Sequence, residues 1–137
     1  RAGCAAAVAS LLRDRGRLDM LVCNAGICPA GTVAGDWEQW HRVIDVNLHG
    51  TQHCVAAAWD ALAAHGDGRI VIVSSMAYYR GGVIVGTEYS ASKAALEMLA
   101  RTYAEETKAS GVRVAIVDPG AMRTRMRAAA MPGEKPE

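Results

Sequence analysis

Apolar residues in this chain follow two alternating patterns, one typical of strands and one typical of helices. Short apolar runs predict buried strands at 18–23, 69–73 and 112–117. Apolar residues that recur at helical spacing predict helices over 2–15, 36–65 and 88–110. Helices that alternate with strands in this way are typical of a parallel sheet, in which crossover helices connect successive strands.

Turn and capping residues support these bounds. Gly16 is placed to cap the end of the first helix. Asp36 is a good N-cap for the second helix, with Gln39 three residues later. Asn47 falls in the middle of that helix, where its side chain competes for backbone hydrogen bonds. It could mark a kink there, although a solvent-facing asparagine is the simpler interpretation of the residue taken alone.

Composition narrows the class of protein. The 137 residues fit one domain, 51% of them are apolar, and the net charge is only +1. This balance favours neither a nucleic-acid partner nor an anionic membrane surface. The longest uncharged run, 20–35, contains Asn24, Pro29 and three glycines and cannot be a membrane-spanning helix. The four cysteines show no CxxC spacing, and we expect a reducing cytoplasmic location.

A tyrosine and a lysine at the start of the third helix carry candidate chemistry. Tyr89 and Lys93 are four residues apart, so a helix places both on one face with Cβ atoms roughly 5–6 Å apart. A cation nearby favours the phenolate over the phenol, whose ordinary pKa is about 10. Ser75, just after the strand at 69–73, could hydrogen-bond a carbonyl oxygen while Tyr89 transfers a proton. A half-buried tyrosine and an exposed lysine on an amphipathic helix form the alternative.

Further motifs accompany this pair along residues 18–124. Asn24-Ala25-Gly26 ends the first strand, Asn47 lies in the long helix, and Asp118-Pro119-Gly120-Ala121-Met122-Arg123-Thr124 follows the last strand. In this order, with Ser75, Tyr89 and Lys93 between them, the motifs resemble those of the short-chain dehydrogenase/reductase family. The resemblance implies an α/β fold, a Rossmann-like doubly wound parallel sheet of which this chain holds the central and C-terminal part. It also implies an NAD(P)-dependent alcohol dehydrogenase or ketoreductase.

The resemblance assigns a role to each matching residue. Tyr89 would be the general acid and base, and Ser75 would orient and polarise the substrate oxygen. Lys93 would lower the pKa of Tyr89 and bind the nicotinamide ribose, while Asn47 would hold a water that links Lys93 to solvent. NAD or NADP would lie against Asn24, Ala25, Gly26, Tyr89, Lys93, Pro119, Gly120, Met122 and Thr124. Ser75 precedes Tyr89 by slightly more than the family's commoner gap, and Ser74, one residue further away, is an alternative hydroxyl. We favour Ser75 because the second serine of such a pair is the usual match in the family.

By the same resemblance, we expect a small-molecule alcohol or carbonyl substrate. We also expect a homodimer or homotetramer formed through the helices at 37–65 and 88–110, with apolar contacts from Trp37, Trp40, Ala57, Ala61, Leu96 and Leu99. A catalytically silent nucleotide-binding subunit is the rival function. A flavodoxin-like binding domain is a third interpretation, which explains the alternation but not Ser75, Tyr89 and Lys93.

Two other clusters favour no separate site. His41, Asp45, His49 and His53 follow one another at four-residue steps, but the stripe winds around the helix and lacks an HExxH sequence. We therefore expect no metal site. Arg123, Arg125 and Arg127 could contact an anionic part of a substrate, although a solvated helix face is the simpler interpretation.

No glycine-rich dinucleotide motif, GxGxxG or GxxxGxG, occurs in the sequence. The nearest glycine-rich run, 81–86, connects Ser75 to Tyr89, so it cannot also serve as the phosphate-binding turn. We therefore expect residues 1–137 to be a single partial domain, the catalytic half of a Rossmann-like domain. The N-terminal dinucleotide-binding portion and the C-terminal end would be missing. Alone, such a half is expected neither to bind NAD(P) nor to fold well.

Overall fold

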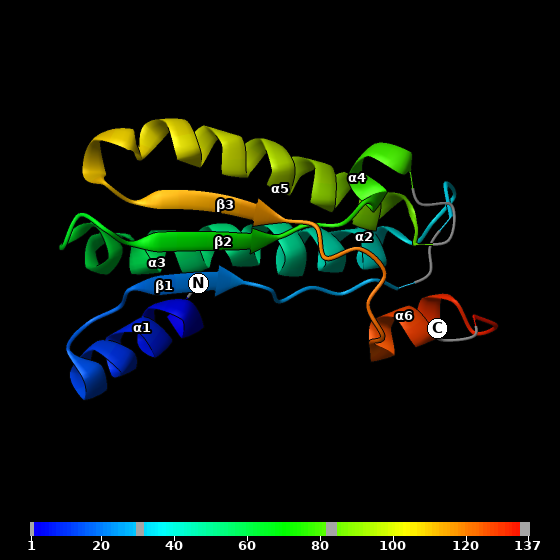
Figure 1. The fold of residues 1–137 in the computed structure, drawn as a ribbon. Helices are drawn as coiled ribbons and strands as arrows, with labels where there is room; N and C mark the ends of the chain where they lie inside the picture. The colour runs from blue at the N-terminus through cyan, green and yellow to red at the C-terminus, as the bar shows by residue number, and fades with distance from the viewer. Residues whose placement is uncertain (1, 30–31, 82–84, 135–137) are drawn as a thin grey trace.

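The computed structural model describes residues 2–29, 32–81 and 85–134, which form an α/β structure around a three-stranded parallel sheet. The strands are β1 (Met20–Cys23), β2 (Arg69–Val73) and β3 (Arg113–Val117), in the order β1-β2-β3. Figure 1 shows all three arrows pointing the same way, toward the end of the sheet where α6 (Arg125–Ala130) lies. The predicted parallel α/β alternation is confirmed. The glycine-rich run at 81–86 lies partly outside the described residues.

The helices keep the predicted order with one division. The first, α1 (Ala2–Arg15), ends as expected at Gly16, whose φ is +72°. The predicted helix over 36–65 contains three parts, which are α2 (Trp37–Ile44), a π-helical turn (Asp45–His49) and α3 (Gly50–Ala63). The last long helix is α5 (Thr87–Glu106), followed by a 3-10 turn at Lys108–Ser110. A short helix, α4 (Ala77–Arg80), was not predicted and interrupts the connection between β2 and α5.

The core lies between the sheet and the helices packed on one of its faces. Parallel pairing aligns Cys23 with Ile72 and Ile72 with Ile116, so these side chains point to the same face. There they meet α3, which packs on β1 and β2, and α5, which packs on β3, while α1 packs beside α3. In Figure 1 the three helices lie along the sheet in this way. This arrangement directs alternate strand residues into the core.

The opposite face of the sheet is less covered than the sequence suggested. Met20 and Val22 of β1 are 52% and 53% exposed, and Val117 of β3 is 42% exposed. In β2, whose apolar run predicts a strand buried on both faces, Val71 and Val73 on this face are only half-buried, so for the part of the chain that the structure describes that prediction is wrong on one face. The physical reason is that all the helices packed against the strands there lie on the face that Cys23, Ile72 and Ile116 occupy.

The carboxyl ends of the strands gather the predicted polar motifs. Asn24 follows β1, Ser74 and Ser75 follow β2, and Asp118-Pro119-Gly120 follows β3. A backbone hydrogen bond of 2.8 Å from Ser74 N–H to the Val117 carbonyl holds two of these ends together. In parallel α/β sheets this edge is where ligands bind. The candidate functional site therefore lies at this edge of the sheet.

Candidate active site

Tyr89 and Lys93 are both buried at the start of α5. Tyr89 is 8% exposed and Lys93 is 5% exposed. The Lys93 ammonium lies 5.6 Å from the centroid of the Tyr89 ring and donates a 2.8 Å hydrogen bond to the Val73 carbonyl at the end of β2. This arrangement rules out the alternative of an exposed lysine on a solvated helix face. A buried ammonium and a buried phenol share one small region instead.

Ser75 is the hydroxyl that reaches Tyr89. The Ser75 hydroxyl lies near enough to the phenol to act on its pKa as a hydrogen-bonding partner, and it accepts a 3.3 Å hydrogen bond from Ala77 N–H. The alternative, Ser74, is 3% exposed, and its Oγ has no hydrogen-bond partner among the described residues. Both serines line the same cavity, but only the Ser75 hydroxyl is paired with the phenol.

Burial dominates the titration of this pair. Burial raises the pKa of Tyr89, and the negative charges of Cys28 and Asp118 raise it further by smaller amounts. The hydrogen bond from Ser75 lowers this pKa and so partly offsets the effect of burial. Burial also lowers the pKa of Lys93. The expectation that Lys93 lowers the pKa of Tyr89 is therefore wrong for this structure. The ammonium is directed to the Val73 carbonyl and the ring, and desolvation of the phenolate is the larger effect.

Asn47 is buried in the π-helical turn, with no exposed surface. Its side-chain oxygen accepts a 2.8 Å hydrogen bond from Ile27 N–H, and its amide nitrogen donates to the Ile27 carbonyl and to Ser92 Oγ, both at 3.0 Å. The Ser92 hydroxyl donates in turn to the Tyr89 carbonyl at 2.7 Å. The helix departs from regular α-helical geometry at Asn47, where a distortion was predicted, and the solvent-facing alternative is wrong because every polar atom of this side chain has a protein partner.

Ile27 and Ser92 were not singled out in the sequence, although both complete the Asn47 network. Ser92 stands three residues after Tyr89, a spacing from which its hydroxyl reaches back to the Tyr89 carbonyl. That spacing was the available signal. Ile27 contributes only its backbone, and no side-chain pattern could have identified it. Together they connect the loop after β1 to the helix that carries Tyr89 and Lys93.

The carboxyl edge of the sheet holds a cavity of about 530 Å³. Its walls include every predicted site residue except Asn47, namely Asn24, Ala25, Gly26, Ser75, Tyr89, Lys93, Pro119, Gly120, Met122 and Thr124. The sequence analysis missed its apolar and sulfur-containing wall, which consists of Cys28, Val85, Met126, Ala130 and Met131. These residues come from loops and from the six-residue helix α6, which are too short to give a periodic signal, so this wall became visible only in three dimensions.

The segment after β3 folds back over the cavity. Gly120 has φ +65°, a conformation that favours glycine, and its N–H donates to the Asp118 carboxylate at 3.1 Å. The Thr124 hydroxyl caps α6 by accepting a 3.1 Å hydrogen bond from Arg127 N–H. The Arg127 guanidinium forms an ion pair with Glu134. Arg127 is the one arginine among the described residues that line this cavity, and its guanidinium is already paired with a carboxylate.

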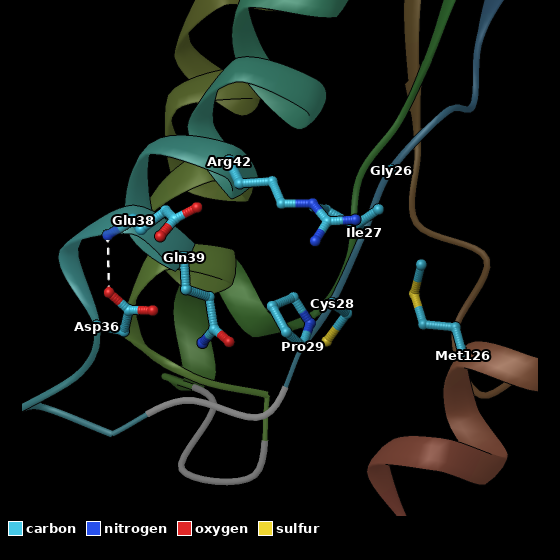
Figure 2. A pocket seen from close by; sticks show the side chains of 9 residues that line it. All are labelled: Gly26, Ile27, Cys28, Pro29, Asp36, Glu38, Gln39, Arg42 and Met126. Carbon is cyan, nitrogen blue, oxygen red and sulfur yellow. Dashed lines mark hydrogen bonds between the residues drawn. The ribbon is translucent and has the colours of Figure 1, made fainter.

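A second cavity of about 540 Å³ adjoins the first and shares Gly26, Cys28 and Met126 with it. Figure 2 shows Arg42 extending from α2 toward Gly26 and Ile27, with Met126 facing them from α6. The Asp36 carboxylate accepts a 2.9 Å hydrogen bond from Glu38 N–H and so caps α2 at the rim of this cavity. The two cavities therefore lie next to each other, with Tyr89 lining only the first.

Neither a metal cluster nor a membrane span is found in the described ranges. No group of three or more His, Cys, Asp or Glu residues within 2–29, 32–81 and 85–134 could hold a metal ion. Within the proposed histidine stripe, His49 Nδ1 instead lies 2.8 Å from the Asp45 carboxylate. No described helix combines the length and apolar character needed to cross a bilayer.

Comparison with known proteins identifies the class. The family model described as short chain dehydrogenase matches residues 1–135, so the chain belongs to the short-chain dehydrogenase/reductase family. Oxidoreductase UcpA of Escherichia coli (strain K12) is 36% identical over 91% of this chain and 48% of its own length. The 2-dehydro-3-deoxy-D-gluconate 5-dehydrogenase of Bacillus subtilis is 35% identical over 85% of this chain and 45% of its own length. The chain thus spans about half the length of these curated relatives.

A solved structure agrees with the fold. A gluconate 5-dehydrogenase from Burkholderia cenocepacia, crystallised with NADP and tartrate, superimposes with a TM-score of 0.89 at 26% identity. The match covers 97% of this chain and 52% of that protein. The resemblance to a Rossmann-like short-chain dehydrogenase is therefore confirmed at the level of family and fold. The chain is similar to about half of a protein of this kind.

Proposed function

We propose that this chain contributes the catalytic half of an oxidoreductase that interconverts an alcohol and a ketone with NAD or NADP. The observation that carries the proposal is that Ser75, Tyr89 and Lys93 line one cavity, where the Ser75 hydroxyl acts on the phenol and the Lys93 ammonium lies 5.6 Å from the phenol ring. A silent nucleotide-binding subunit would need no such pairing of a proton donor with a second hydroxyl. The family membership is consistent with the oxidoreductase.

The residues around Gly26 fit a dinucleotide. A Cβ at Gly26 would lie 3.4 Å from Asn47 Oδ1 and 3.9 Å from Lys93 Nζ, so glycine keeps open the space between the loop after β1 and Lys93. NAD or NADP would be held by Asn24, Ala25 and Gly26 on one side and by Pro119, Gly120, Met122 and Thr124 on the other. When bound, the nicotinamide supplies or accepts the hydride.

The chain's own residues would handle the proton. In carbonyl reduction, Tyr89 would donate its phenolic proton to the substrate oxygen, and Ser75 would donate a hydrogen bond that holds that oxygen in place. In alcohol oxidation, Tyr89 must first lose its proton, which burial disfavours because it raises the pKa of this phenol. Lys93 would hold the ribose, and the backbone of Asn47, whose side-chain polar atoms already have protein partners, would hold the water that links Lys93 to solvent.

The cavity walls favour a neutral substrate. Cys28, Met122, Met126 and Met131 supply sulfur and apolar surface, and Arg127 is engaged with Glu134. An anionic group entering the cavity would therefore have to displace Glu134, rely on Lys93 or reach Arg42 in the adjoining cavity. We infer a small neutral alcohol or ketone rather than a carboxylate-bearing one.

We further propose that the protein forms a homodimer or homotetramer through α2, α3 and α5. Trp37 is 69% exposed, Met98 on α5 is 65% exposed, and a cavity of about 360 Å³ lies between α3 and α5. Leu96, which was expected at this contact, is 2% exposed and belongs to the core, because its side chain faces the sheet. Light scattering on the full-length protein tests this, and a monomer would contradict it. A cytoplasmic location remains our proposal.

The activity is tested by following NAD(P)H absorbance with the full-length protein and a panel of neutral ketones, with keto acids as the comparison set. We expect oxidation of NADH or NADPH with at least one neutral ketone. Cofactor binding without turnover on any ketone, measured by fluorescence and absorbance together, would favour the silent subunit. Turnover of keto acids alone would preserve the oxidoreductase and contradict the neutral-substrate inference.

A further inference from the structure

Two cysteines from different helices meet away from the active site. Cys4 lies in the first turn of α1 and Cys54 in the second turn of α3, and their sulfur atoms are 3.3 Å apart. Both side chains are half-buried, and both residues are free thiols in this structure. The contact is between residues 50 positions apart in sequence, so the packing of α1 on α3 creates it.

We propose that Cys4 and Cys54 are a redox-active pair that forms an intramolecular disulfide when the protein meets a low-molecular-weight disulfide such as oxidised glutathione. A disulfide bond is about 2.05 Å long, so the two sulfurs would need to approach by roughly 1 Å from their present 3.3 Å. Small changes in the side-chain torsions of two helical cysteines can supply that approach. The inference does not depend on the proposed oxidoreductase activity.

The chemistry assigns different roles to the two sulfurs. Burial raises the pKa of the Cys54 thiol to about 11, which makes Cys54 the slower nucleophile, so Cys4 loses its proton and attacks first. The disulfide bond of oxidised glutathione breaks, one glutathione leaves as a thiolate that takes up a proton, and Cys4 is left as a mixed disulfide. Cys54 then loses its proton and attacks the Cys4 sulfur, which releases the second glutathione. The two protein thiols lose two electrons, and oxidised glutathione is reduced to two thiols.

Cys23 is the competing partner. It is 8% exposed at the end of β1, and charges on Cys4 and Cys54 act on it, so it lies near the pair. Burial raises the pKa of the Cys23 thiol to about 12 and that of Cys54 to about 11. Cys23 therefore reacts slowly, and the half-buried Cys4 is the sulfur that an external disulfide reaches first.

The bond would tie together the part of the chain that carries half of the site. The segment between Cys4 and Cys54 contains β1, the Asn24-Ala25-Gly26 turn and Asn47. Closing a loop of this size restricts the unfolded chain and should raise the thermal midpoint by roughly 5 °C or more. The disulfide would therefore act as a reversible staple between α1 and α3.

The test is peptide mapping by mass spectrometry, without reduction, of the full-length protein equilibrated in glutathione buffers of increasing oxidised fraction. We expect a peptide pair joined through Cys4 and Cys54, lost on addition of dithiothreitol, and a higher thermal midpoint of the oxidised form. Cys4→Ser and Cys54→Ser should each show only a glutathione adduct on the remaining cysteine. The matched control Cys28→Ser should form the bond as the wild type does.

Three outcomes would overturn the proposal. These are a bond through Cys23, glutathione adducts on Cys4 without any crosslink, and thiols that remain free throughout the series. The map of the wild-type protein decides between them even if a serine variant fails to fold. A crosslinked protein whose thermal midpoint does not rise would overturn the role of the bond as a staple.

Discussion

The Gln39 side chain donates a 2.6 Å hydrogen bond to the carboxylate of Glu88, which joins α2 to the first turn of α5. Glu88 is 3% exposed and immediately precedes Tyr89. The carboxylate has therefore been removed from water, and the amide of Gln39 replaces part of its hydration. Through this contact, a residue on α2 helps to hold the backbone position of the proposed proton donor.

Replacing Glu88 with alanine should lower stability and turnover together. The change leaves the Gln39 amide without this acceptor, and the loss of a hydrogen bond to a charged group costs about 1.5–3 kcal/mol. We expect urea unfolding to show this loss, and kcat to fall while the pH profile keeps its shape. Glu88→Gln is the matched control, because it keeps an acceptor oxygen and should recover most of both. Equal stability of Glu88→Ala and wild type would contradict this role for the contact.

Tyr89→Phe should abolish most turnover while the fold is preserved. The change removes one hydroxyl, and general acid–base groups contribute roughly 10²–10⁴-fold to rate. Steady-state kinetics and circular dichroism measure the two effects. Tyr103→Phe is a matched control on the same helix, because Tyr103 packs against the core and does not line the catalytic cavity. If Tyr89→Phe retained more than about a third of wild-type turnover, Tyr89 could not be the general acid.

Ser75→Ala should move the pH dependence of alcohol oxidation upward. The hydrogen bond from Ser75 lowers the pKa of Tyr89, against the larger effect of burial, so its removal must raise that pKa further. Oxidation requires the phenolate, and its rate therefore increases as pH rises through the Tyr89 pKa. We expect the inflection in kcat/KM to lie at higher pH in the variant than in the wild type. An inflection at the same pH would show that the bond does not influence the phenol.

Asn47→Ala should destabilise the protein more than a surface substitution does. The variant leaves the partly buried Ile27 N–H and carbonyl without these partners, and each unsatisfied group shielded from water costs up to about 1–3 kcal/mol. Urea unfolding measures the loss. Asn24→Ala is the comparison, because Asn24 is exposed and should change stability by about 0.5 kcal/mol or less. Similar losses in the two variants would mean that the Asn47 network contributes little.

Gly26→Ala should separate binding from folding. The added Cβ would make ordinary contacts, at 3.4 Å from Asn47 Oδ1 and 3.9 Å from Lys93 Nζ, so the thermal midpoint should change little. It would occupy space that we assign to the cofactor, and kcat/KM should fall by at least roughly tenfold, since even a 1 Å misplacement can cost about 10²-fold. Gly133→Ala, whose Cβ meets nothing within 4 Å, is the control. Full activity of Gly26→Ala would remove Gly26 from the proposed site.

The sequence predicts well the order of helices and strands and the gathering of the polar motifs at one edge of the sheet, because both follow from local patterns. The apolar runs identify β1, β2 and β3 to within two residues, and the strand ends gather Asn24, Ser75 and Pro119 at one edge. What it could not predict depends on the neighbours of a residue in space. The burial of Asn47 requires Ile27 from another element, and the contact between Cys4 and Cys54 requires two helices to pack.

The electrostatics of Tyr89 illustrate the same limit. A four-residue spacing places Lys93 near Tyr89, and this part of the prediction agrees with the 5.6 Å distance. The direction of the pKa shift, however, depends on how completely the phenol is desolvated and on where the ammonium points. Neither quantity is encoded in the spacing, and burial reverses the expected sign.

The π-helical turn at Asp45–His49 has a consequence for how this chain tolerates changes in length. A π turn contains one residue more than a regular α-helical turn, and each residue of an α-helix advances the chain by about 100° around its axis. Deleting a single residue there would therefore rotate Gln39 by about a quarter of a turn relative to α3 and away from Glu88. Homologous exchange or engineering across this helix must preserve the residue count between Gln39 and Thr51.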